Sequence, residues 1–361
     1  MMLKVREIIN SRKNFWEQNG PRNDIVLSTR IRLGRNADSI PFHDSMTDRD
    51  FDLIKDIADS FISKTTFGEN TICFDINKLD LHEKRLLLEK NIITSEMENS
   101  DKSLILINNE RDFTILINDT DHFRIQVIRS GFQLDDAYKE ADTIDNELNS
   151  IVKYAFSQDF GYLTADPINV GTGLNVSVIM HLPVLTALKR INEFVPFIRE
   201  YGFQITGTLG AAGRVTGGLY LIRSKKYIGI TEAEVTQGAD DIINRIIKSE
   251  DESRDEFFTI SKNELEDNSW RSLGILLYAR RINYVEAIEH LSRIRLGIIM
   301  SVIKDYSLSA INDLMVKIQW AHLQEYFGIR FKSIIDSDDY RAVFLRTELK
   351  KELKTSGDSN V

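Results

Sequence analysis

The sequence has few residues of the kinds that build disulfide frameworks or metal centres. Among its 361 residues there are one cysteine, Cys73, and six histidines. One cysteine excludes a disulfide framework and any cysteine-based zinc site. No apolar run approaches the roughly 20 residues that span a bilayer, and the charged segment 1–16 lacks the apolar stretch of a signal peptide. We therefore expect a soluble cytoplasmic protein with no metal site and no membrane contact.

Basic residues are also fewer than acidic ones. The chain carries 46 Lys and Arg against 55 Asp and Glu, a formal net charge of −9. This balance argues against non-specific binding of nucleic acid, which depends on cations that neutralise phosphates. The 42 % of apolar residues, with 19 Phe and 11 Tyr, is ample material for a core. The length suggests two domains.

The first two thirds of the chain mix strand and helix patterns. A β-branched run over 24–33 predicts a strand, and apolar spacing after Thr47, a plausible N-cap, predicts a helix over 47–65. Further helices are expected over 79–92 and 135–156. Strands are expected at 103–109 and 112–119, joined as a hairpin, at 123–128, and on both sides of a glycine loop within 203–222.

A charged run separates this part from a mainly helical remainder. The segment KSEDESRDEF (248–257) lies in the last part of a long helix predicted over 234–259, and such charged runs are usually solvated surfaces. We therefore divide the chain into a mixed domain over 20–256, a helical domain over 257–353 and a flexible polar tail over 354–361.

Arginines and glycines in three separate elements suggest an anion site. Arg30 and Arg32 alternate along one strand and so share a face. Arg124 ends a second short element, Asp-His-Phe-Arg (121–124). The third element is the turn Gly-Thr-Gly (171–173), whose backbone amides can approach an anion closely. Guanidinium groups presented from strands suit a polyphosphate. Taken singly, each feature is a weak signal, because alternating arginines on a strand are more often solvated or salt-bridged and a Gly-Thr-Gly turn is usually only a turn.

Two histidines lie in informative surroundings. His122 stands directly before Phe123 and Arg124, where it can pack against or orient its neighbours. His181 falls in an apolar run and is expected to be a core histidine with its hydrogen bonds satisfied.

Several motifs together resemble the phosphagen (ATP:guanido) kinases, and among them the bacterial protein arginine kinases of the McsB type. The motifs occur in the family's order; they are STRIRLGRN (28–36), EKRLLLEK (83–90), NDTDHFRIQ (118–126), GYLTADPINVGTGLNVSVIMHLP (161–183), ITGTLGAAGRVTGG (205–218), LSRIRLGI (291–298) and SDDYRA (337–342). The resemblance implies an α+β, glutamine-synthetase-like catalytic domain with a central antiparallel sheet flanked by helices. It also implies a helical C-terminal domain that reads phosphoarginine and forms a homodimer.

The implied reaction transfers the γ-phosphoryl group of ATP to a protein arginine, with Mg²⁺ held on the phosphates. Family members surround the phosphates with five arginines, and only three of these positions are arginine here, because Asn175 and Thr206 replace the other two. The nucleotide-binding residues implied by the resemblance are Ser28, Thr29, Arg30, Ile31, Arg32, Arg124, Asn175 and Thr206.

The acceptor side departs further from the family. A guanidinium with a pKa above about 12 is a poor nucleophile until it loses a proton. The family uses two motif glutamates, a loop glutamate and a cysteine, where this chain has Asp119, Thr120, Ala211 and Asp166. Losing a general base costs about 10²–10⁴ in rate.

Two functions remain open at this point. The first is a pseudokinase or adaptor that binds ATP or phosphoarginine weakly. The second is an active protein arginine kinase in stress response and protein quality control, with Asp119 or Asp166 supplying the base.

A second site is implied in the C-terminal domain. The family's phosphoarginine pocket reads RDxxRA, and this chain keeps Asp338 and Arg341 but has Ser337 in place of the first arginine. An ion pair on a helix surface explains Asp338 and Arg341 equally well. By analogy the partners are arginine or phosphoarginine side chains of proteins, a small McsA-type activator and a Clp unfoldase.

Overall fold

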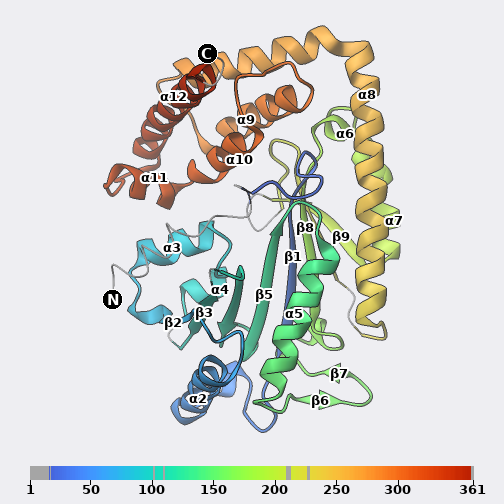
Figure 1. The fold of residues 1–361 in the computed structure, drawn as a ribbon, viewed down its shortest axis with the longest axis vertical. Helices are drawn as coiled ribbons and strands as arrows, with labels where there is room; N and C mark the ends of the chain where they lie inside the picture. Colours follow the sequence, from blue (N-terminus) through green and yellow to red (C-terminus); the bar gives the residue numbers. More distant parts are fainter. Residues whose placement is uncertain are drawn as a thin grey trace.

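A single antiparallel sheet forms the centre of the molecule. The computed structural model describes residues 16, 18–100, 102–108, 110–208, 213–225 and 228–358. Within them, eight strands pair in the order β2-β3-β4-β5-β1-β8-β10-β9 (Figure 1). The strands are β1 (Val26–Arg35), β2 (Thr71–Asp75), β3 (Leu104–Asn108), β4 (Phe113–Ile117), β5 (Phe123–Ser130), β8 (Leu174–His181), β9 (Phe203–Gly207) and β10 (Leu219–Ser224). The predicted α+β fold with a central antiparallel sheet is confirmed.

The alternation of β1 separates a core face from a polar face. Ile31 and Leu33 are fully buried in the main core, together with apolar side chains of α5 (Leu134–Asn149) and the first half of α8 (Glu232–Tyr278). Arg30 and Arg32 point to the opposite side because successive strand residues face opposite ways. Helix α5 lies across β1 and β5 (Figure 1). The opposite face of β1 is thus available for a site, whereas β3 and β4 bury a separate apolar cluster on that side.

The remaining helices follow the sequence patterns closely at their N-termini. Thr47 caps α2 in a capping box with Asp50, as its position predicted. The helix expected over 79–92 is shorter, because Asp80 caps it and a 3₁₀ turn precedes it. The helices are α2 (Asp48–Lys64), α3 (Leu81–Glu89), α4 (Ser95–Glu98), α6 (Pro183–Ala187), α7 (Val195–Glu200), α9 (Tyr284–Ile299), α10 (Leu308–Lys317), α11 (Trp320–Phe327) and α12 (Ile334–Asp358), with 3₁₀ turns η2 (His43–Ser45), η3 (Ile76–Lys78), η4 (Pro167–Asn169) and η5 (Arg190–Glu193).

Two helix ends differ from the prediction. Helix α5 stops at Asn149 rather than 156, since the chain turns away to form a ribbon of β6 (Phe156–Ser157) with β7 (Gly161–Tyr162). Helix α8 spans 47 residues and continues through the charged run, with one non-helical residue at Ser261 (φ −124°, ψ 30°). The domain boundary expected at 256/257 therefore lies within α8, just before this kink.

The helical C-terminal part has its own core and packs beside the sheet domain. Its buried side chains come from the end of α8 and from α9 to α12, and of these helices α11 lies next to α3 (Figure 1). Helix α12 continues to Asp358. Of the expected tail, residues 359–361 lie outside the described part, and the tail's flexibility stays a prediction. Among the helices of the described ranges, none combines the length and apolarity needed to cross a bilayer.

A buried arginine joins the two parts. Arg295 of α9 is inaccessible to solvent and donates to the Asp24 carbonyl (2.8 Å) and to His181 Nδ1 (2.7 Å). His181 Nε2 in turn bonds to Ser292 Oγ at 2.7 Å. Burial, and then the charge of Arg295, lowers the pKa of His181 well below its usual value. His181 is therefore a neutral, hydrogen-bonded core histidine, as its apolar surroundings predicted.

Candidate active site

Two of the predicted arginines project from the centre of the sheet. On β1, Arg30 lies opposite Ser177 of β8, and its Nε donates to the serine Oγ at 3.0 Å. Arg32 lies between Gln126 of β5 and Asn175 of β8, and its Nε donates to Gln126 Oε1 at 2.7 Å. Each guanidinium keeps its terminal nitrogens for another acceptor, because only Nε is used in these bonds.

Arg124 joins them from β5, where it lies opposite Gly34 of β1. Its Nη1 pairs with Asp119 Oδ2 at 2.5 Å. The Asp119 side chain is completely enclosed, and its other oxygen accepts from Thr94 Oγ1 at 2.7 Å. Asp119 is thus engaged in holding Arg124 and the start of α4.

The cluster is electrostatically unfavourable as it stands. Burial, and then the charges of Arg124 and Arg223, lowers the pKa of Arg30 to about 10. Burial also lowers the pKa of Arg32, with Arg30 and Arg124 adding to the effect. Neither Arg30 nor Arg32 forms an ion pair with a carboxylate of the residues described. Arg124 has a counter-ion in Asp119, which with Glu96 partly offsets the lowering of the Arg32 pKa, so Arg30 and Arg32 are the charges of this cluster that most favour a bound anion.

A cavity of about 520 Å³ opens beside the arginines, within the usual range for small-molecule sites. The predicted site residues that line it are Arg32, Thr120, Arg124, Asp166 and Asn175. The structure therefore brings together residues from three separate motifs, and it puts Thr120 and Asp166 in the same cavity as the arginines expected to bind phosphate.

Other predicted residues lie beside the cavity or away from it. Ser28 and Arg30 line a much smaller adjoining space. Thr29 and Ile31 face the core side, where Thr29 Oγ1 donates to the Gly131 carbonyl at 2.7 Å. Thr206 lies on β9 and pairs with Leu221 of β10. Ala211 lies outside the described residues.

The glycine turn is shaped by contacts within the protein. Gly173 has a positive φ of 64°, and a Cβ there would lie 2.6 Å from both Arg35 Nη1 and the Gly34 carbonyl. Arg35 Nη1 also holds the turn directly, because it donates to the Thr172 carbonyl at 2.9 Å. Gly173 is required for this close packing, and the turn forms one rim of the cavity.

The Asp121–His122 pair holds the segment that carries Asp166. Asp121 Oδ1 accepts from Asn36 Nδ2 (2.7 Å) and from the Ala165 amide (2.8 Å). His122 Nδ1 accepts from the Ala37 amide at 3.1 Å and its Nε2 donates to the Pro41 carbonyl at 2.9 Å, while burial lowers its pKa. Both residues position neighbouring segments, which agrees with the orienting role expected for His122.

Three charged residues of the cavity were not singled out from the sequence. Glu96 comes from the short helix α4, and Arg223 and Lys225 come from the end of β10 and the residue beyond it. Glu96 lies near enough to Arg124 for the arginine to help lower its pKa, although burial opposes this. These segments are far apart in the sequence and are brought together by the fold. The charged residues RSK (223–225) were the only sequence feature that could have indicated these two cations.

The predicted phosphoarginine residues of the C-terminal domain bond to each other. Arg341 is 3 % exposed and forms an ion pair with Asp338. Its other donors reach the carbonyls of Ile318 (2.9 Å) and Ile282 (3.1 Å). The two residues therefore form an ion pair, but a buried one rather than the helix-surface pair expected as the alternative, and the phosphoarginine pocket stays a prediction.

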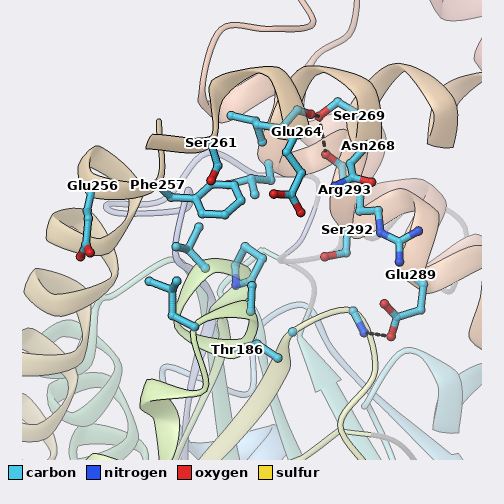
Figure 2. Close-up of a pocket in the computed structure, with 18 of the residues that line it drawn as sticks. Thr186, Glu256, Phe257, Ser261, Glu264, Asn268, Ser269, Glu289, Ser292 and Arg293 are labelled. Carbon is cyan, nitrogen blue, oxygen red and sulfur yellow. Dashed lines mark hydrogen bonds between the residues drawn. The ribbon is translucent and has the colours of Figure 1, made fainter. Parts of the chain in front are cut away.

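A second cavity, of about 530 Å³, lies where α6, the kink of α8 and α9 meet (Figure 2). Figure 2 shows Glu264 directed into it from α8 and Glu289 bonded to the loop before β10. This bond runs from the Gly217 amide to Glu289 Oε1 at 2.7 Å. This hydrogen bond connects the loop before β10, in the sheet domain, to helix α9 of the C-terminal part.

Comparison with known families agrees with this geometry. A family model described as "ATP:guanido phosphotransferase, C-terminal catalytic domain" matches residues 52–253. A second, described as "Protein-arginine kinase McsB C-terminal domain", matches residues 262–360.

Curated relatives cover nearly the whole chain. The protein-arginine kinase of Clostridium acetobutylicum is 34 % identical over 340 residues, which are 94 % of this chain and 100 % of that protein. The protein-arginine kinase of Bacillus subtilis (strain 168) is 33 % identical over 354 residues, 97 % of each chain.

Solved structures share the fold at lower identity. The duplicated taurocyamine kinase of Schistosoma mansoni matches with a TM-score of 0.59 at 19 % identity, covering 74 % of this chain and 41 % of that one. A lombricine kinase matches with a TM-score of 0.57 at 21 % identity, covering 68 % and 75 %. The chain therefore belongs to the protein-arginine kinase family of ATP:guanido phosphotransferases.

Proposed function

We propose that this protein binds ATP weakly in the cavity beside Arg32 and acts mainly as a pseudokinase or adaptor, with strongly impaired phosphoryl transfer. One observation carries the proposal: the cavity that gathers Arg32, Arg124 and Arg223 has Thr120 at the position of the family's catalytic glutamate. Cations for a phosphate chain are present, and the groups that prepare a guanidinium acceptor are depleted.

The phosphate side retains most of what binding requires. Arg32 and Arg124 line the cavity, and Arg30 lies on the same face of β1 one pleat away. Their planar donor groups suit phosphate oxygens, and an anion relieves their mutual repulsion. Mg²⁺, when bound with the nucleotide, neutralises phosphate charge while sitting on phosphate oxygens and waters, so it needs few protein ligands.

The acceptor side lacks a general base of the family type. Thr120 has no proton-accepting carboxylate, and Asp119 already bonds to Arg124 and Thr94. A base is worth about 10²–10⁴ in rate and one electrostatic donor about 10²–10³. These factors do not add simply, but losing several of them together removes most of the acceleration.

A second candidate function is an active protein arginine kinase with a rearranged site. Asp166 and Glu96 both line the cavity that contains Arg32 and Arg124. A carboxylate there can pair with an acceptor guanidinium and receive its proton. Protein arginines as substrates, phosphoarginine binding at Asp338 and Arg341, a homodimer, an McsA-type activator, a Clp unfoldase and a cytoplasmic location are proposed by family analogy alone.

Two assays on the full chain test the proposal. Titration with Mg·ATP should show binding by wild type that weakens about tenfold to a hundredfold in the Arg30→Ala/Arg32→Ala variant. Removing the exposed Arg271 on α8 is the control and should leave affinity unchanged. Equal affinities in all three proteins would mean that the arginine cluster is no phosphate site.

The catalytic half needs a product assay. Mg·ATP and an arginine-rich acceptor are incubated with the protein, and phosphoarginine is detected by mass spectrometry under non-acidic conditions. We expect little or no transfer. Robust transfer that disappears in Asp166→Ala would establish the active kinase instead.

A further inference from the structure

Two positive side chains reach the cavity beside Arg32 from the end of β10, a segment that the family motifs quoted above do not include. Arg223 and Lys225 line the same cavity as Arg32 and Arg124. Both side chains are exposed, so their charged ends are accessible to a ligand.

Strand pairing fixes the place of Arg223 on the site face. It lies directly opposite Ser177 of β8, and Ser177 lies directly opposite Arg30 of β1. Directly opposed residues of antiparallel strands share a face. Arg30, Ser177 and Arg223 therefore form one row across three neighbouring strands.

The same pairing puts the two cations between the positions where the family's arginines are missing. Strand β10 lies between β8, which carries Asn175, and β9, which carries Thr206. Thr206 is opposite Leu221, so Arg223 is its diagonal neighbour two residues along β10. Lys225 lies two residues beyond Arg223 in the direction that runs from Ser177 toward Asn175. Diagonal neighbours on one face are about 7–8 Å apart, within reach of long side chains.

These charges lack acidic partners in the described part of the chain. Neither Arg223 nor Lys225 forms an ion pair with a described carboxylate. The chain as a whole is acidic, with a net charge of −9, so a local group of unpaired cations is unusual. The charge of Arg223 also acts on Arg30, since it contributes to lowering the arginine's pKa.

We propose that Arg223 and Lys225 supply the phosphate contacts that arginines at positions 175 and 206 supply in the family, so that the charge of the nucleotide site has moved onto β10. This inference rests on the proposed nucleotide site and extends it to residues outside the family's motifs. Arg223 contributes a planar donor group and Lys225 a point charge, so Arg223 is the stronger contact.

Mg·ATP affinity of the full chain tests the relocation. Arg223→Ala should weaken binding about tenfold to a hundredfold and Lys225→Ala about threefold to tenfold, because charge-assisted contacts are lost. Arg271→Ala, which removes an exposed arginine of α8 paired with Asp267, is the matched control and should bind like wild type. Each variant is first checked for an unchanged thermal midpoint.

A rescue variant separates a phosphate contact from a general effect of charge. Adding Asn175→Arg to Arg223→Ala should restore most of the lost affinity, since an arginine then returns to the family position on the neighbouring strand. Adding Asn263→Arg, which places the same extra charge at an exposed position of α8, to Arg223→Ala should restore none.

The outcomes distinguish this inference from the proposed function. If wild type binds and Arg30→Ala/Arg32→Ala weakens binding while Arg223→Ala matches the control, the relocation is wrong and the nucleotide site stands. If wild type shows no binding of Mg·ATP, the nucleotide site and the relocation both fail.

Discussion

Restoring a carboxylate at position 120 should raise phosphoryl transfer. Thr120 is partly exposed and lines the same cavity as the cations and Asp166, so Thr120→Glu introduces an acid into an existing space. The neighbouring Arg124 already has a partner in Asp119. The introduced carboxylate is therefore available to orient an acceptor guanidinium and take its proton.

The size of the effect follows from the chemistry of the missing base. General-base catalysis is worth about 10²–10⁴ in rate, or roughly 2.7–5.4 kcal/mol of barrier. Arg32 has no carboxylate partner and attracts the new charge, which competes with the acceptor. We therefore expect the lower end, an increase of about a hundredfold in phosphoarginine formation.

The assay compares initial rates of phosphoarginine formation at saturating Mg·ATP for wild type, Thr120→Glu and Thr120→Gln. The glutamine variant has nearly the same shape without a base, and it should stay at the wild-type rate. The reasoning is refuted if both variants gain equally. It is also refuted if Thr120→Glu gains nothing while its ATP affinity remains within about threefold of wild type.

Three further predictions concern the fold around the site. The pKa of His181 is lowered in the fold, so below about pH 6.5 the unfolded chain binds a proton that the folded chain does not. The free energy of unfolding should therefore be constant above about pH 6.5 and fall below it by up to about 1.4 kcal/mol per pH unit. Urea unfolding should show a smaller fall in stability with acid for His181→Gln. Arg341→Ala should lower the free energy of unfolding by about 3 kcal/mol, because Asp338 and two carbonyls lose their partner; unchanged stability with lost phosphoarginine binding would favour a pocket instead. Glu289→Ala should speed hydrogen exchange at the Gly217 amide, and unchanged exchange would mean that this bond does not hold the loop.

Local patterns in the sequence were enough to predict much of the fold. Alternation along β1 correctly separates Ile31 from Arg30 and Arg32, because a strand's period of two is a property of the backbone. The capping box at Thr47 likewise depends on residues three apart. The continuation of α8 beyond its charged run to Tyr278 was not predicted, since a solvated charged segment is as compatible with a helix as with a boundary.

The composition of the site was predictable only in part. Arg32, Arg124 and Asp166 belong to recognisable motifs and do meet at one cavity. The role of Asp119 depends on a contact with Thr94, and the presence of Arg223 depends on the register of β10 against β8. Such pairings are set by tertiary packing, which single-sequence patterns do not encode.

The most direct test of the account is one calorimetric titration with Mg·ADP, repeated in the presence of nitrate and arginine. Nitrate imitates the planar phosphoryl group in transfer, so a competent site binds the three components together more tightly than ADP alone. We predict that Mg·ADP binds, that Arg32→Ala weakens this binding about tenfold, and that nitrate with arginine changes the affinity by less than about threefold. Tightening of about tenfold or more would show that the acceptor side is intact, and would contradict the account.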